Sequence, residues 1–220
     1  MVDLLALQKQ FILAHLGEGE VAADFTMGNG NDTLFLSQTV GATGRIYAFD
    51  LQESALVSTR RHLEEKGAPL NYTLICASHD RLGEFIHEPI KAGMFNLGYL
   101  PGGQEVGITT RRVTTLPAIR AALDILAPDG ILLVAVYPGH EEGRLEGEAI
   151  AEYAATLSRY QICASRFQLL NSPAAPYFYI FEKALDRPLR RPGRAAKNAA
   201  RAARLADRIN QASRSVEEDS

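Results

Sequence analysis

The fold of this chain is decided by residues 24–33, which read DFTMGNGNDT. The apolar residues just before this stretch predict a short buried strand over 21–25, and apolar side chains at helical spacing follow it. A glycine loop between a strand and a helix lets a ligand approach the backbone closely at the helix N-terminus. We therefore expect Gly28, Asn29 and Gly30 to hold a ligand.

Working outward from this loop, strand-like and helical segments alternate along most of the chain, which predicts a parallel sheet with helices on both faces. The final two strands are separated only by a loop, so they can pair as an antiparallel hairpin. The expected fold is therefore α/β and Rossmann-like, with seven strands, mostly parallel, as in the class I methyltransferases. The remaining strands are predicted at 45–50, 72–76, 94–97, 131–136, 161–167 and 177–181. The helix after the glycine loop is expected to run through Leu34, Leu36 and Val40, and the other helices are expected near 4–16, 52–66, 114–126 and 141–158.

Two local expectations accompany these elements. Asp3 is a plausible N-cap of the first helix, and Pro117 is expected in the first turn of its helix, where a missing N–H costs little. The segment 128–130, Pro-Asp-Gly, is expected to be a turn before the strand at 131–136.

Asp50 lies 20 positions after Gly30, at the end of the next predicted strand, where a carboxylate can accept both ribose hydroxyl protons. This would suit a dinucleotide as well as S-adenosylmethionine (SAM). However, Thr33 stands where a dinucleotide loop has its third glycine, and Asp24 beside a pyrophosphate would place two anions face to face. Asp24 suits a cofactor with a positive sulfonium and an amino group, although it could instead cap or brace the loop. SAM is therefore the predicted cofactor.

A second constellation follows the fourth predicted strand, where residues 96–103 read NLGYLPGG. It faces the same crevice as the glycine loop, since the carboxyl ends of parallel strands share one edge. The side-chain carbonyl of Asn96 can hold an incoming amine, and Tyr99 can form a wall of the pocket or stack on a base. The alternative is a tight turn in which the Gly and Pro residues are required only by the backbone geometry and bind no ligand.

Polar residues also follow the third and fifth predicted strands. Ser78 and His79 come after one and His140 after the other, so either His can bond a ligand, relay a proton or simply be solvated. Arg111 and Arg112 follow the Gly-rich loop and can pair with phosphate, or can be an ordinary surface pair.

Five motifs in this order resemble a bacterial methyltransferase family once labelled putative rRNA methylases, whose members methylate the 5-aminomethyl group of wobble (2-thio)uridine in tRNA. The resemblance covers about residues 1–183, although Ala77 stands where comparable members often have an acid that contacts adenine. The motifs are DFTMGNGNDTLFL at 24–36, FDLQESAL at 49–56, SHD at 78–80, FNLGYLPGG at 95–103 and YPGH at 137–140.

The resemblance implies a cofactor site and an acceptor site at the same edge of the sheet. An aliphatic amine has a pKa of roughly 10, so it must lose a proton before it can attack the methyl group. We expect Asn96 to orient the amine while His79, His140 or Asp24 takes or relays that proton. The cofactor residues would be Asp24, Gly28, Asn29, Gly30, Asp50, Gln52, Ser78, His79 and Asn96, and the substrate residues Asn96, Tyr99, Gly102, Gly103 and His140, joined by Arg111 and Arg112.

Composition and charge restrict the partners. The segment 1–185, the expected methyltransferase domain, carries a net charge of −7, and the extension 186–220 carries +4. Residues 187–214 include nine basic residues and only one acidic residue, so this stretch could form a helical RNA-binding arm or a solvated extension. The expected partner is tRNA rather than DNA, and a homodimer is compatible with the resemblance.

No apolar run is long enough to span a bilayer, and the N-terminus does not read as a secretory signal, so a cytoplasmic location is expected. The five histidines show no metal-binding spacing, so no metal is expected. Cys76 and Cys163 lie in apolar strand-like runs and are expected to be buried free thiols.

Three functions remain open from the sequence. An RNA-modifying methyltransferase accounts for both motifs and the resemblance, whereas a small-molecule amine or oxygen methyltransferase accounts for the cofactor site equally well. Methylation of another RNA, such as rRNA, is a variant of the first. A cofactor-binding module without catalysis would leave the Asn96 loop without a purpose.

Overall fold

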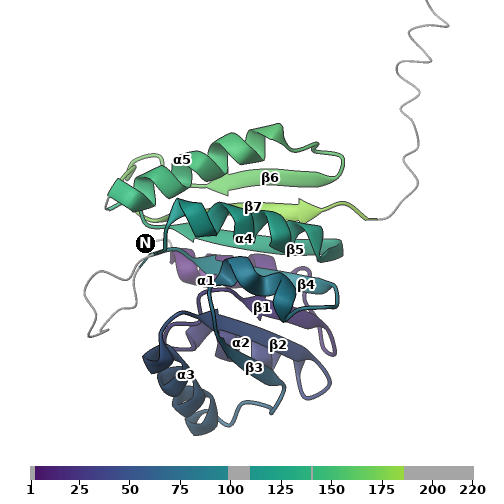
Figure 1. The fold of residues 1–220 in the computed structure, drawn as a ribbon. Coiled ribbons are helices and arrows are strands. Elements are labelled where there is room, and N and C mark those ends of the chain that lie inside the picture. Colours follow the sequence, from purple (N-terminus) through teal and green to yellow (C-terminus); the bar gives the residue numbers. More distant parts are fainter. Residues whose placement is uncertain (1–2, 99–109, 140, 186–220) are drawn as a thin grey trace, which may run out of the picture. The chain divides into compact units, whose positions relative to one another are not determined.

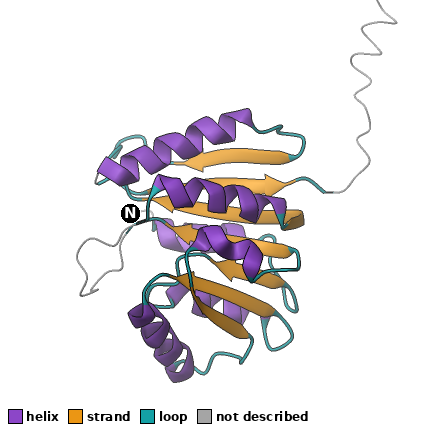
Figure 2. Cartoon of the chain, viewed as in Figure 1, coloured by secondary structure: helices purple, strands orange, loops and turns teal. Residues whose placement is uncertain are grey.

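The computed structural model describes residues 3–98, 110–139 and 141–185 (Figure 1). The predicted extension over 186–220 lies outside these residues. Figure 2 shows a single sheet with helices against it. The strands are β1 (Val21–Asp24), β2 (Arg45–Asp50), β3 (Tyr72–Cys76), β4 (Ile90–Asn96), β5 (Leu126–Val136), β6 (Ile162–Phe167) and β7 (Tyr177–Lys183). The helices are α1 (Leu4–Leu13), α2 (Asn31–Val40), α3 (Glu53–Glu65), the short 3₁₀ helix η1 (His79–Glu84), α4 (Arg112–Asp124) and α5 (Glu141–Thr156).

The seven strands form one sheet in the order β3-β2-β1-β4-β5-β7-β6. The first five strands in this order are parallel, while β7 runs antiparallel between β5 and β6. This is the predicted class I methyltransferase fold, including the antiparallel hairpin of the last two strands. Because β1 lies between β2 and β4, the loops that follow these three strands meet at one edge of the sheet.

Alternating side chains build a separate core on each face of the sheet. One face packs against η1, α4 and α5 through a cluster that contains Phe25, Phe95 and Ile119. The other face packs against α1 and α2 through a cluster that contains Ile12 and Leu36. In Figure 1, α4 and α5 accordingly lie in front of the sheet and α1 and α2 behind it.

Local details confirm some expectations and correct others. Asp3 caps α1, since its Oδ1 accepts from the backbone N–H of Leu5 and Ala6 at 3.0 and 3.1 Å. Pro117 is not in the first turn but inside α4, because that helix already begins at Arg112.

The segment 128–130 was expected to be a turn before a strand, but it lies inside a longer strand. β5 begins at Leu126, and its pairing with β4 shifts in register between Ile90 and Ala92. Asp129 adopts a φ of 58° there. A strand irregularity thus accommodates the Pro-Asp-Gly sequence.

The expectation for both cysteines was wrong. Cys76 and Cys163 are free, as expected, but exposed rather than buried. They lie in β3 and β6, the two edge strands of the sheet, which are covered less completely than the central strands. An apolar run alone could not distinguish an edge strand from a central one.

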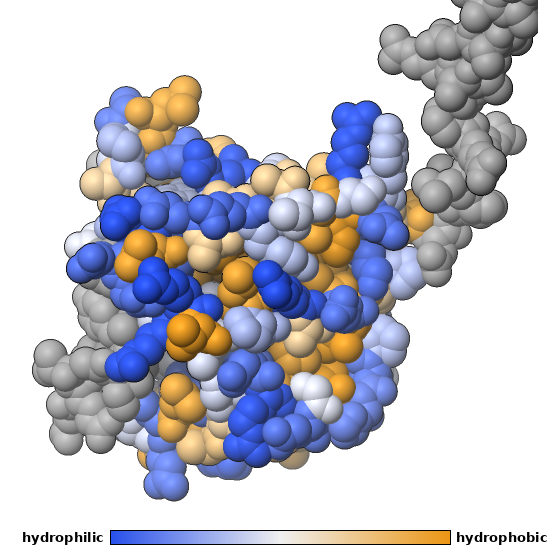
Figure 3. Space-filling model, turned by 45° about the horizontal axis from the view of Figure 1, so that its top comes forward, coloured by the Kyte–Doolittle hydropathy of each residue, from blue (hydrophilic) through white to orange (hydrophobic). Residues whose placement is uncertain are grey.

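No helix within the described ranges combines the length and the apolarity that a membrane span needs. Apolar residues on the face drawn in Figure 3 are interspersed with hydrophilic ones. The homodimer stays a prediction.

Candidate functional site

The glycine loop lies where β1 ends and α2 begins. Backbone hydrogen bonds fix its path: Met27 N–H donates to the Phe49 carbonyl at 2.8 Å, and Gly30 N–H donates to the Met27 carbonyl at 2.7 Å. Gly28 and Gly30 have φ values of 51° and 83°, which favour glycine. The loop is therefore a preformed turn at the carboxyl edge of the sheet.

Helix α3 packs directly against this turn. A Cβ on Gly30 would lie 3.0 Å from the Cα of Thr59 and 2.9 Å from its Cγ2. The Thr59 hydroxyl donates to the Gly28 carbonyl at 3.0 Å, and the Ser58 hydroxyl donates to Asn29 Oδ1 at 3.0 Å. The sequence did not reveal these α3 residues, since helical spacing alone does not show what a helix face touches.

Asp50 ends β2 beside the glycine loop, as predicted. Its Oδ2 accepts from Gly28 N–H at 3.1 Å, and its Oδ1 accepts from Gln52 N–H at 3.0 Å. The carboxylate is thus held by two backbone donors, and it is partly exposed. Each oxygen keeps a lone pair that can accept a ligand hydroxyl proton. This geometry suits ribose recognition.

Asp24, at the end of β1, is completely buried. Its carboxylate accepts from Thr33 Oγ1 at 2.6 Å and from Thr26 N–H at 3.1 Å. Burial raises the pKa of Asp24 to about 7, and the nearby carboxylate of Asp32 adds to this effect. These bonds brace the loop, which was the alternative role, and the raised pKa leaves a proton-transfer role available.

The raised pKa predicts how stability depends on pH. The folded state holds the Asp24 proton up to about pH 7, whereas the unfolded chain releases it near the ordinary aspartate pKa of 3.8. The stabilising contribution is therefore complete below about pH 4 and is lost as pH rises to about 7. Asp24→Asn should remove this decline, which amounts to at most about 4 kcal/mol. Urea unfolding of both proteins across this range measures the difference, and parallel curves would contradict the shifted pKa.

His79 begins η1 and is buried against the ring of Phe95, with ring centroids 5.5 Å apart. Its Nδ1 lies 3.3 Å from the Phe25 carbonyl, and among the described residues its buried Nε2 has no hydrogen-bond partner. Burial lowers the pKa of His79, so the neutral ring is favoured. With Nδ1 protonated, Nε2 is an acceptor available to a ligand. Ser78 precedes it and makes no capping hydrogen bond.

Asn96 ends β4, next to β1 in the sheet. Its backbone N–H donates to Thr26 Oγ1 at 2.7 Å, and its side-chain Nδ2 donates to Asp32 Oδ2. Its Oδ1 is buried and has no hydrogen-bond partner among the described residues. Because a buried acceptor is costly to leave unpaired, this oxygen marks the place where a donor group of a ligand fits.

The structure does not bring all predicted catalytic residues together. Neighbouring residues of a strand point to opposite faces, so Asn96 lies on the α2 side of β4, whereas Phe95 and the adjoining His79 lie on the α4 side. Asp24 lies on the α2 side through its bond to Thr33. Asn96 and Asp24 therefore share one side of the site, and His79 flanks the other.

Asp32 was missed by the sequence reasoning. It occupies the first turn of α2, and its Oδ1 lies 3.8 Å from Lys9 Nζ of α1. Burial raises the pKa of Asp32, while Lys9 and the bond from Asn96 oppose the rise. Its position two residues after Gly30 was a usable signal, since the first turn of that helix must lie near the loop.

The predicted substrate residues Tyr99, Gly102, Gly103 and His140 lie outside the described residues. The two ends of the intervening segment meet: Gly98 N–H donates to Thr110 Oγ1 at 2.9 Å, and Thr110 N–H donates to the Gly98 carbonyl at 3.0 Å. The Thr110 hydroxyl also donates to the buried Glu146 at 3.0 Å. Gly98 belongs to the predicted loop at 96–103, whereas sequence reasoning did not single out Thr110.

Arg111 and Arg112 stand at the start of α4, directly after the clamp, and both are exposed. The backbone N–H of Arg112 donates to Glu142 Oε1 at 3.1 Å. Arg111 and Arg112 thus follow the clamp of Gly98 and Thr110, which lies just past the end of β4.

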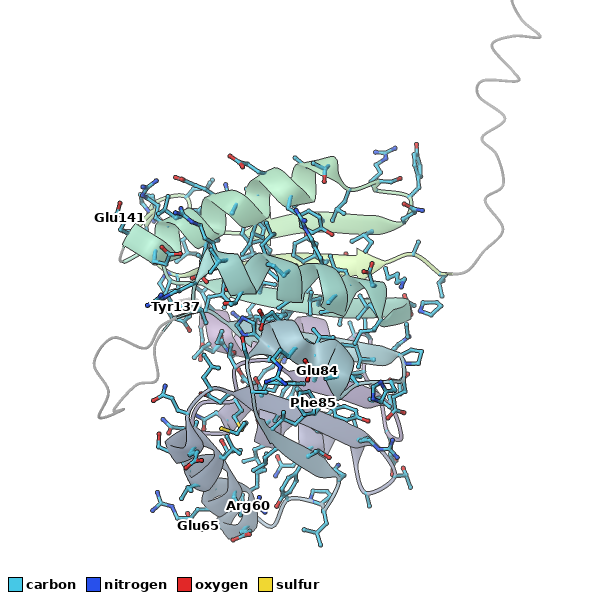
Figure 4. The ribbon with its side chains drawn as sticks, viewed as in Figure 1. Arg60, Glu65, Glu84, Phe85, Tyr137 and Glu141 are labelled. Atoms are coloured by element: carbon cyan, nitrogen blue, oxygen red, sulfur yellow. The ribbon has the colours of Figure 1, made fainter. Side chains whose placement is uncertain are left out.

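A groove of about 240 Å³ lies between the start of α1 and the carboxyl end of β5. Tyr137, Gln8 and Tyr177 are among its lining residues. Figure 4 shows Tyr137 at the side of the sheet where Glu141 begins α5. Burial raises the pKa of Tyr137, and the charge of Asp32 adds to this rise. The groove therefore adjoins the Asn96 side of the site. A larger groove of about 490 Å³ lies along α3 and includes Cys76.

A family model described as "Putative rRNA methylase" matches residues 46–183, more than half of the chain. A putative rRNA methylase structure from Clostridium thermocellum is 34% identical with a TM-score of 0.80, over 83% of this chain and 98% of that one. A putative methyltransferase from Streptococcus mutans, solved in complex with SAH, is 36% identical with a TM-score of 0.75, over 83% and 99% of the two chains.

A curated relative from Arabidopsis thaliana, the chloroplastic tRNA (mnm(5)s(2)U34)-methyltransferase, is 38% identical over 169 residues. The match covers 72% of this chain but only 61% of the Arabidopsis protein. With the matched family model, the shared fold and the two near-full-length structural relatives, the assignment follows: the chain belongs to the family described as putative rRNA methylases and has the class I fold of SAM-dependent methyltransferases.

Proposed function

We propose that this protein is a SAM-dependent methyltransferase that N-methylates the 5-aminomethyl group of a wobble (2-thio)uridine in tRNA. The observation that carries the proposal is the buried Oδ1 of Asn96 at the carboxyl end of β4, which has no hydrogen-bond partner in the part of the chain that the structure describes. An acceptor oxygen in this position fits the N–H of an incoming amine. The Arabidopsis relative, a tRNA (mnm(5)s(2)U34)-methyltransferase, supports the same class of acceptor.

The residues at the β1 and β2 ends fit the cofactor. Asp50 would hold the ribose hydroxyls, and the turn at Gly28–Gly30 leaves the backbone accessible because it carries no side chain at either end. Gln52, Ser78 and His79 would complete the wall on the α3 and η1 side. When bound, SAM supplies a methyl group on a positively charged sulfur.

The protein's own residues would then position the acceptor and manage its proton. Asn96 Oδ1 accepts from the amine and fixes its direction, which is a large part of the catalytic effect in a displacement. Asp24 shares this side of the site and has a pKa of about 7, so it suits proton uptake near neutrality. Arg111 and Arg112 would pair with phosphates of the RNA.

The direct test incubates the protein with methyl-labelled SAM and tRNA that carries the 5-aminomethyl group, followed by digestion to nucleosides. Label should appear in the methylaminomethyl nucleoside. A matched tRNA transcript without the aminomethyl group should stay unlabelled. Label in another nucleotide would show a different RNA activity, and label only in small metabolites would refute the RNA substrate.

Asp50→Ala should weaken SAH binding by about tenfold or more, because a carboxylate that bonds two hydroxyls is worth about 1.5–3 kcal/mol per charged hydrogen bond. Isothermal titration calorimetry measures the change. The control is Glu65→Ala, which removes an exposed acid at the far end of α3 and should leave affinity unchanged. Equal affinities for wild type and Asp50→Ala would exclude the ribose role.

A further inference from the structure

Asp32 holds the side chain of Asn96 in one orientation. An ionised carboxylate can only accept hydrogen bonds, so the Asn96 group that faces Asp32 Oδ2 must be the Nδ2 donor. The same bond leaves Asn96 Oδ1 directed away from Asp32 and without a partner among the described residues. Which end of the amide a ligand meets is therefore set by a residue of α2, not by β4 alone.

The charged surroundings of this pair favour a cation. Four groups face Asp32 from neighbouring elements: Lys9 of α1, Asp24 of β1, Asn96 of β4 and Tyr137 after β5. The ammonium of Lys9 is 3.8 Å away and its side chain is 34% exposed, so water screens it, whereas the side chain of Asp32 is only 15% exposed. The carboxylate of Asp32, when ionised, leaves this side of the site negative because water screens its lysine, and Asp24 adds to this charge only when it loses its proton near pH 7.

We propose, on the basis of the proposed function, that Asp32 is a positioning residue that acts through Asn96 and selects acceptors with a protonatable amino group over neutral hydroxyl acceptors. Asn96 Oδ1 alone would accept from an amine or from a hydroxyl. The carboxylate behind it stabilises a positive group at that oxygen and leaves a neutral group unaffected. Specificity for the amine thus comes from the negative charge of Asp32, in the first turn of α2.

The first test is binding, which needs no turnover. Protein saturated with SAH is titrated with 5-aminomethyluridine and with 5-hydroxymethyluridine near pH 7. The wild type should bind the amine about tenfold or more tightly than the alcohol, and Asp32→Asn should lose most of this preference. SAH affinity should change by less than about twofold, because in the proposed function Asn96 and Asp32 serve the acceptor rather than the cofactor.

The second test is the pH profile of single-turnover methylation of 5-aminomethyl tRNA. The neutral amine is the nucleophile, so the rate rises with pH through the pKa of the bound amine. A negative charge beside the amine raises that pKa, so Asp32→Asn should move the rising limb to lower pH by about one unit. A merely structural role of Asp32 would lower the plateau and leave the midpoint in place.

Two further variants serve as checks. Asp129→Asn is a matched control, since Asp129 also lies 3.8 Å from a lysine, Lys91, but stands near the start of β5 at the opposite end of the sheet. It should leave both tests unchanged. Lys9→Gln removes the ammonium that partly offsets the charge of Asp32, so it should raise the amine preference, and it gives a second result if Asp32→Asn does not fold.

The outcomes separate the two proposals. An amine preference that survives Asp32→Asn, an equal affinity of the wild type for amine and alcohol, or a large loss of SAH affinity in Asp32→Asn would each overturn the role of Asp32. A lower preference in Lys9→Gln would also overturn it. If the wild type binds the amine selectively but does not methylate the tRNA, the proposed function fails and the role of Asp32 stands.

Discussion

Gly30→Ala should lower the thermal midpoint by roughly 5–15 °C and weaken SAH binding by about 100-fold or more. The φ of 83° at this position costs a residue with a Cβ about 1–2 kcal/mol. The added Cβ would also lie 3.0 Å from the Thr59 Cα, and backbone cannot rotate aside as a side chain can. Such overpacking typically costs a further 1–3 kcal/mol, and each kcal/mol shifts the midpoint of a domain of this size by roughly 2–4 °C.

The affinity should fall because α3 and the glycine loop must move apart, and the loop also positions Asp50 through the Gly28 N–H. Thermal unfolding and calorimetric titration with SAH measure the two effects. Gly67→Ala is the matched control: it has a φ of 62° but no atom within 4 Å of the new Cβ. Gly67→Ala should therefore lose only the stability that the positive φ costs an alanine, and it should bind SAH normally. If both variants lose stability equally and both bind SAH normally, the packing of α3 does not shape the site.

Asn96→Ala should slow single-turnover methylation by about 10²–10³-fold while SAH affinity changes little. Removing one preorganised hydrogen-bonding group at a reacting centre typically has an effect of this size. The substitution removes a buried oxygen that lies next to Asp32 and has no hydrogen-bond partner among the described residues, and it leaves the backbone bond from Asn96 N–H to Thr26 in place. Rapid-quench kinetics with enzyme in excess over RNA separates the methyl transfer from product release.

A second asparagine provides the contrast. Asn71 is also buried, and its side chain donates to the carbonyls of Ser37 and Gly41 at 2.9 and 2.7 Å and accepts from the Ser37 hydroxyl at 2.6 Å. Asn71→Ala should lower the free energy of unfolding but leave the transfer rate of the folded protein close to normal. A rate loss in Asn71→Ala as large as that in Asn96→Ala would mean that the kinetic effect reports folding rather than chemistry.

The sequence predicted the fold well because its main signals are local. These signals depend on residues close to one another in the chain. They are the glycine loop after an apolar strand, the acid at the end of the next strand, and the alternation between the hydrophobic periodicities of strands and helices. The predictions were wrong where the outcome depended on residues that are distant in the chain but adjacent in the fold. The exposure of Cys76 depends on β3 being an edge strand, and the extension of β5 through 128–130 depends on its pairing with β4.

The site divides in the same way. Sequence alone placed Asp50 and Asn96 at strand ends and so at one edge of the sheet, because every parallel strand presents its carboxyl end there. Tertiary structure decided that β1 lies beside β4, which brings Asn96 onto Asp32 across 64 positions of sequence. Tertiary structure also packed Thr59 of α3 against Gly30. Such contacts follow from strand order and helix packing. The sequence alone therefore predicted the loop at Gly28–Gly30 and placed Asp32 close to it, whereas the contact by which Asp32 orients the amide of Asn96 appeared only in the folded protein.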